Sequence, residues 1–136
     1  MTVVVCTDTR GGMLFAGRRQ SRDRVMLADL AALVGDGRLW CRPFSEKLLV
    51  GAGLTPTVAE DCPSLAGAED TVFIEAPPLT PYLPTISRLI VYSWCEAYPY
   101  DAALDLVPTA LGFTCVEIAE FEGNSHKKIR KEVYVR

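Results

Sequence analysis

Short apolar runs and polar stretches alternate along this chain of 136 residues. The first apolar run, at residues 2–6, is rich in valine and is typical of a strand buried on both faces. Apolar residues then recur at helical spacing over residues 25–34, where we predict a helix that Ser21 caps and Gly35 ends. A second helix is predicted over residues 43–51, because proline is tolerated in the first turn of a helix.

The rest of the chain adds strands and one further short helix. We predict a short strand at residues 38–41, a weak edge strand at 55–60, a loop at 62–70, strands at 71–75 and 88–95, a short helix from Thr80, and a terminal pair of strands at 113–122 and 128–136. Because strand and helix alternate through the first two thirds, the strands there are expected to be parallel, with helices on both faces. The Gly-Asn turn makes the C-terminal strand antiparallel. We therefore predict a single three-layer α/β/α domain over residues 1–136.

Composition is consistent with an ordinary soluble domain, since 49% of the residues are apolar and 23% are charged. No apolar stretch approaches the roughly 20 residues that a membrane helix requires, and the N-terminus is interpreted as a first strand, not a signal peptide. We therefore expect a cytoplasmic protein without a membrane segment. Five cysteines with no Cys-x-x-Cys motif and a single histidine, His126, predict reduced thiols and no metal site.

Charge is unevenly distributed, although the net charge is only −3. Residues 1–24 contain five arginines and two aspartates, whereas residues 60–122 contain eleven acidic residues and one basic residue. The arginines most indicative of function are Arg18, Arg19, Arg22 and Arg24. Arg22 and Arg24 fall in the first turn of the predicted helix, where cations oppose the helix macrodipole and a bound phosphate or carboxylate would offset that cost. Alternatively, these arginines pair with Asp23 and Asp29 or face water.

The order of motifs in the second half resembles the dihydrofolate reductase family. Residues 82–89 read Tyr-Leu-Pro-x-x-x-Arg-Leu and lead into a strand, Tyr-Asp follows at residues 100–101, and Asn-Ser-His at residues 124–126 precedes the closing strand. These motifs are similar to the Phe-Leu-Pro helix, the Gly-Asp turn and the C-terminal hairpin of that family. The resemblance covers nearly the full length. It implies a dihydrofolate reductase-like, mostly parallel sheet with an antiparallel C-terminal strand.

The same resemblance implies roles for several residues. Asp8, followed by Gly-Gly-Met at residues 11–13, lies where the family has its flexible active-site loop. Asp29 corresponds to the family's acidic substrate ligand on the first helix. A shift of the alignment by one helical turn would place Asp23 there instead. Arg42 follows the second strand, where the family's arginine helps to hold the NADPH phosphate. Aromatic residues at the end of a parallel strand, Tyr92 and Trp94, are candidates for a platform that stacks against a ring, or for core packing.

One departure from the family concerns the cofactor. The family has a Gly-Gly pair after the strand at residues 71–75, which lets the backbone approach the pyrophosphate and donate hydrogen bonds. Here the residues are Glu75, Ala76, Pro77 and Pro78, so two donors are lost and a negative charge is added. The Pro-Trp of the active-site loop is absent as well. We therefore expect no cofactor, or NADPH only in an altered position, and no ordinary dihydrofolate reduction.

Three functional hypotheses follow. The first is that a degenerate cleft binds a small anionic or nucleotide-like ligand, or a partner, through residues that include Arg18, Arg19, Arg22, Asp29 and Arg42. The second is an NADPH-dependent reductase with an altered cofactor position. The third is a nucleic-acid-processing protein, because the chain also resembles short bacterial proteins sometimes labelled ribonuclease Z; the overall acidity and the lone histidine argue against it. The pair formed by Ser125 and His126 lacks a placed acid and is weak evidence for nucleophilic catalysis.

Overall fold

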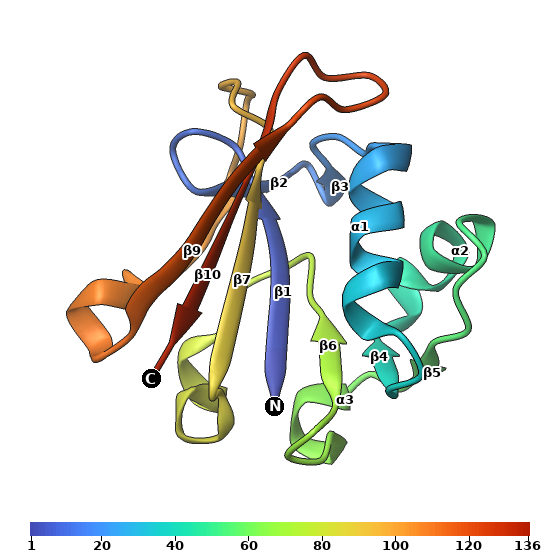
Figure 1. The fold of residues 1–136 in the computed structure, drawn as a ribbon, viewed down its shortest axis with the longest axis vertical. Coiled ribbons are helices and arrows are strands. Elements are labelled where there is room, and N and C mark those ends of the chain that lie inside the picture. Colours follow the sequence, from blue (N-terminus) through green and yellow to red (C-terminus); the bar gives the residue numbers. More distant parts are fainter.

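A seven-stranded sheet with the order β5-β4-β6-β1-β7-β10-β9 forms the centre of the computed structural model, which describes residues 1–136 (Figure 1). The strands are β1 (Thr2–Thr7), β4 (Leu39–Cys41), β5 (Thr57–Val58), β6 (Thr71–Phe73), β7 (Arg88–Ser93), β9 (Thr114–Phe121) and β10 (Ile129–Val135). Strand β1 pairs in parallel with β6 and β7, whereas β10 is antiparallel to both β7 and β9. The predicted mostly parallel sheet with an antiparallel C-terminal strand is confirmed.

Helices α1 (Arg24–Val34) and α2 (Pro43–Gly51) cover one face of this sheet (Figure 1). Leu30 of α1 and Leu49 of α2 are fully buried against strand residues such as Phe73. The cap of α1 differs from the sequence prediction, because Asp23 and not Ser21 is the N-cap. The Asp23 carboxylate accepts hydrogen bonds from the N–H groups of the first turn, whereas the Ser21 hydroxyl is engaged elsewhere.

The opposite face is covered by short helical segments. They are α3 (Cys62–Leu65) and two 3₁₀ helices, η1 (Thr80–Thr85) and η2 (Pro108–Leu111). Apolar side chains on this face include the fully buried Val3, Val72 and Leu89. The single turn of α3 lies in a segment predicted to be a loop, since its four residues are too few to show helical periodicity. None of the helices combines the length and the hydropathy needed to cross a bilayer.

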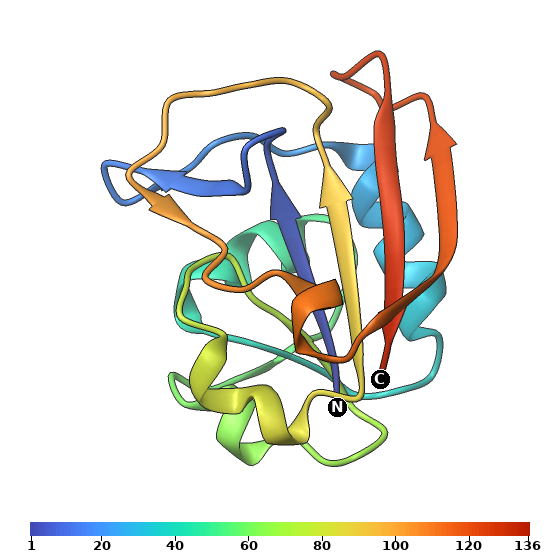
Figure 2. The ribbon, with the colours of Figure 1, turned by 90° about the vertical axis from the view of Figure 1, so that its left-hand side faces the viewer.

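A second, three-stranded sheet was not predicted. It has the order β3-β2-β8 and consists of β2 (Gly12–Phe15), β3 (Arg18–Arg19) and β8 (Ala102–Ala103). Figure 2 shows it beside the carboxyl ends of β1 and β7. Strands of two to four residues are too short to show an alternating apolar pattern, which is why the sequence did not indicate them.

Asp8 holds the loops at this end of the molecule together. Its buried carboxylate accepts hydrogen bonds from the N–H groups of Arg10, Gly12 and Tyr98 and from the Gln20 amide. Burial alone would raise the pKa of Asp8, but these hydrogen bonds lower it below its ordinary value. Asp8, which the resemblance placed in the active-site loop as a candidate ligand-binding residue, thus organises the backbone after β1.

Candidate functional site

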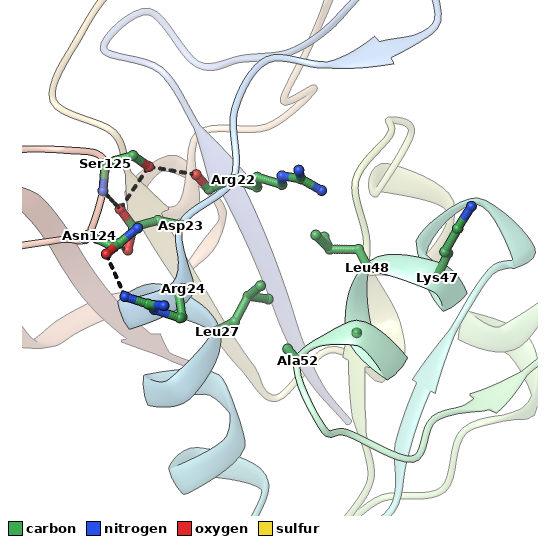
Figure 3. A pocket seen from close by; sticks show the side chains of 10 residues that line it. Arg22, Asp23, Arg24, Leu27, Lys47, Leu48, Ala52, Asn124 and Ser125 are labelled. Carbon is green, nitrogen blue, oxygen red and sulfur yellow. Dashed lines mark hydrogen bonds between the residues drawn. The ribbon is translucent and has the colours of Figure 1, made fainter.

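A cavity of about 330 Å³ lies between the N-terminal end of α1 and the second half of α2 (Figure 3). Leu27 of α1 and Leu48 of α2 form apolar parts of its wall. Three basic side chains also line it, and they are Arg22, Arg24 and Lys47. The loop between β9 and β10 closes one side with Asn124 and Ser125. The cavity therefore brings several cations together with apolar surface.

Two of the three cations have no partner within the protein. Arg24 donates a hydrogen bond of 2.8 Å from its guanidinium to the side-chain oxygen of Asn124. The charged groups of Arg22 and Lys47 make no hydrogen bond or ion pair, and both residues are exposed. Figure 3 shows them on opposite sides of the cavity, Arg22 ahead of α1 and Lys47 on α2. The cavity therefore presents positive charge that no protein group neutralises.

The only acidic residue lining this cavity, Asp23, is already saturated with donors. Besides the helix N–H groups, its oxygens accept hydrogen bonds from the backbone N–H groups of Asn124 and Ser125, at 3.0 and 2.9 Å. Burial alone would raise the pKa of Asp23, but these N–H groups and the His126 ring hold it well below its ordinary value. The first N–H groups of α1 are therefore occupied by Asp23, so an anion here would be recognised by side chains.

A second cavity of about 430 Å³ lies at the carboxyl ends of β4 and β6. Glu75 lines it and forms a bidentate ion pair with Arg19 through two hydrogen bonds of 2.8 Å. Ser45 donates a third hydrogen bond of 2.6 Å to the same carboxylate. The hydrogen bonds to Glu75 raise the pKa of Arg19. Pro77 and Pro78 line the cavity as well and carry no N–H donor.

The remaining residues predicted to bind a ligand are spread over the molecule. Arg42 lines the second cavity and donates to the Glu60 carbonyl at 3.0 Å, whereas Arg18 lies exposed on β3 and lines neither cavity. Asp29 lies within α1, where its carboxylate accepts from the Tyr92 hydroxyl and pairs with Lys131 at 3.0 Å.

The two candidate stacking residues are both in the interior. Tyr92 is fully buried, and the burial together with Asp29 raises its pKa. Trp94 is 2% exposed and stacks on the His126 ring with a centroid separation of 4.6 Å. The structure therefore places Arg22 at the first cavity and Arg42 at the second, with Arg19 bound to Glu75 of the second cavity's lining, instead of gathering all the predicted residues in one cleft.

Sequence reasoning missed two features of this region. Lys47 reads as an ordinary exposed helical lysine, and only the packing of α2 beside α1 places it at the cavity. The acid that the Ser-His pair lacked is Asp23, whose carboxylate lies 2.8 Å from Nδ1 of His126 across 103 residues of sequence. No local pattern could have indicated either contact.

No protein-family model and no curated protein matches the chain. Among solved structures, the chain is similar to dihydrofolate reductase from Enterococcus faecalis complexed with NADP(H) and RAB-propyl. The TM-score is 0.68 and the sequence identity is 13%, with 100% of this chain and 96% of that chain covered. A likeness at this identity shows the fold. The chain therefore has a divergent dihydrofolate reductase-like fold, as its motif order predicts.

Proposed function

We propose that this protein binds a small anionic, nucleotide-like ligand in the cavity between α1 and α2 and does not act as a dihydrofolate reductase. The observation that carries the proposal is the pair of unpartnered cations, Arg22 and Lys47, on opposite sides of a cavity with apolar walls. Unpaired cations around a concave site raise the local concentration of anions. A volume of about 330 Å³ is at the lower end of the range for small-molecule sites, about 300–1,000 Å³.

The lining residues define the chemistry of the ligand. A phosphate or carboxylate would lie between Arg22 and Lys47, where both side chains can donate charge-assisted hydrogen bonds. A flat, weakly polar group would pack against Leu27 and Leu48. The amide of Asn124, fixed by Arg24, offers a polar contact at the edge. A mononucleotide combines these three kinds of group in one small molecule.

The second cavity argues against the cofactor position of the family. Glu75 lines this cavity and its carboxylate is neutralised by Arg19, so a pyrophosphate there would meet a negative charge and would have to compete for Arg19. Pro77 and Pro78 cannot donate backbone hydrogen bonds to phosphate oxygens. These residues do not fit NADPH in the mode of the family. The alternative with an altered cofactor position rests on Arg42 alone.

Thermal unfolding and calorimetric titration with adenosine monophosphate, inorganic phosphate and NADPH test the proposal. A ligand at ~100 times its dissociation constant stabilises the fold by about 2.7 kcal/mol. We expect this stabilisation with adenosine monophosphate. The double variant Arg22→Ala, Lys47→Ala should bind it at least tenfold more weakly, a loss of about 1.4 kcal/mol in binding free energy.

Arg18→Ala is the matched control, because it removes the same charge from an exposed position that lines neither cavity. The affinity of this variant for adenosine monophosphate should stay within twofold of that of the wild type. Stabilisation by NADPH that Arg42→Ala abolishes would contradict the proposal and favour a reductase. Equal loss of binding in the control and in the double variant would also contradict it, since general attraction to a basic surface would then be sufficient.

A further inference from the structure

A serine, the only histidine and a buried aspartate form a continuous hydrogen-bonded chain beside the start of α1. The Ser21 hydroxyl lies 2.8 Å from Nε2 of His126. On the other side of the ring, Nδ1 lies 2.8 Å from the Asp23 carboxylate. The three residues come from the segment before α1 and from the loop between β9 and β10, so the arrangement exists only in the folded chain.

The hydrogen bonds fix the role of each ring nitrogen. The pKa of Asp23 is well below its ordinary value, so the carboxylate is ionised and can only accept the proton on Nδ1. In the neutral ring Nε2 then carries a lone pair, and the Ser21 hydroxyl is the group that donates to it. Trp94 stacks on the imidazole at an interplanar angle of 21° and holds its plane. This is the order of contacts in which a serine hydroxyl becomes a nucleophile.

The three side chains differ in solvent exposure in the way that a site with a serine nucleophile requires. The side chains of His126 and Asp23 are 3% and 0% exposed, so the base and its orienting carboxylate are shielded from water. Ser21 is only half-buried and can be reached from solvent. The backbone N–H of Arg22, directly after Ser21, makes no hydrogen bond within the protein, and the residue after the nucleophile is the one that supplies an oxyanion donor in serine hydrolases with a nucleophile elbow.

We propose that Ser21 is the nucleophile of an acyl-transfer site that hydrolyses small activated esters. His126 is the general base and Asp23 is the residue that orients it. This activity goes beyond the proposed binding function and does not depend on it. Asp23 also lines the cavity between α1 and α2, but Ser21 and His126 do not, and the cations of the binding proposal take no part in the reaction.

The step balances without a cofactor. The Ser21 oxygen attacks the ester carbonyl carbon, and its proton passes to Nε2 of His126. The bond from that carbon to the leaving oxygen breaks, and the imidazolium gives its proton to the departing alkoxide or phenoxide. Water then attacks the acyl-serine in the same way, with His126 as the base, so the products are a carboxylic acid, an alcohol or phenol, and the free enzyme.

Covalent labelling with a fluorophosphonate tests the assignment on the intact protein. The probe phosphonylates a serine activated by a base and releases fluoride. We expect one label per chain, located on Ser21 by peptide mass spectrometry, and no label on Ser21→Ala. His126→Gln should slow labelling about 10²-fold or more, because the general base is lost. p-Nitrophenyl acetate hydrolysis should fall in parallel.

Ser64→Ala is the matched control, because Ser64 donates to the carboxylate of Asp61 at 3.0 Å but has no imidazole partner. It should label at the wild-type rate. The absence of a label on the folded wild type, or a label on any residue other than Ser21, would overturn the proposal. Localisation on the wild type does not depend on whether a variant folds. Because the side chains of Arg22 and Lys47 take no part in the acyl-transfer step, failure of the binding proposal would leave the labelling of Ser21 unchanged.

Discussion

The Asp23 carboxylate joins α1 to the loop before β10, and its removal gives a stability prediction with a calculable size. Asp23→Ala removes the N-cap of α1, which costs typically about 1 kcal/mol. It also leaves the buried Nδ1 of His126 without its partner, which adds about 1–3 kcal/mol. The N–H groups of Asn124 and Ser125 belong to exposed residues, so water can replace the carboxylate there at little cost. We therefore expect a total loss of about 2–4 kcal/mol.

Urea unfolding followed by circular dichroism measures this loss. The midpoint should fall while the slope with denaturant stays the same, because the surface exposed on unfolding is unchanged. Asp36→Ala provides the control, since Asp36 is exposed and makes no hydrogen bond or ion pair; surface changes of this kind stay within about 0.5 kcal/mol. A loss for Asp23→Ala that is no larger than the control would refute the role of Asp23 as the link between the two segments.

Three further predictions concern the same contacts and the second cavity. Arg19→Ala should destabilise the fold by about 1.5–3 kcal/mol, because it leaves the nearly buried Glu75 carboxylate with Ser45 as its only side-chain donor. Adding Glu75→Gln to the Arg19→Ala variant should recover part of that loss, as measured by urea unfolding. Gly123→Ala should cost about 1–3 kcal/mol, since its new Cβ would lie 2.5 Å from a carboxylate oxygen of Asp23; an unchanged midpoint would contradict this. The folded-state pKa values of Asp8 and Asp23 are lowered, so the stability they contribute is complete above about pH 4 and is lost as the pH falls below it. Unfolding free energies from pH 5 to pH 2 should therefore decline less steeply for Asp23→Ala than for the wild type.

Much of the fold could be predicted because the relevant signals are local. The valine-rich run of β1 and the periodic apolar residues of α1 are sufficient to place both elements, and Pro43 and Gly51 mark the ends of α2. The identity of the α1 cap could not be predicted, because Ser21 and Asp23 are both good caps. In the structure the Ser21 hydroxyl binds the distant His126, whereas the Asp23 carboxylate caps the helix and also contacts the other nitrogen of the same ring.

The candidate site was less predictable than the fold. The negative charge of Glu75 at the cofactor position could be read from the sequence, but its pairing with Arg19 spans 56 residues. Arg22 was predicted to lie at the start of a helix near an anion, yet its opposite neighbour Lys47 comes from another helix. Ion pairs and cavities depend on contacts between distant segments, and a single sequence contains no periodic signal for them.

We propose that the cavity between α1 and α2 holds an anionic ligand. Titration of ¹⁵N-labelled protein with adenosine monophosphate, followed by amide chemical shifts, tests it most directly. We expect saturable shifts confined to the residues around the cavity, such as Arg24, Leu48 and Ala52, with no change at Ala76 in the second cavity. Shifts centred on Ala76, or none at saturating nucleotide, would contradict it.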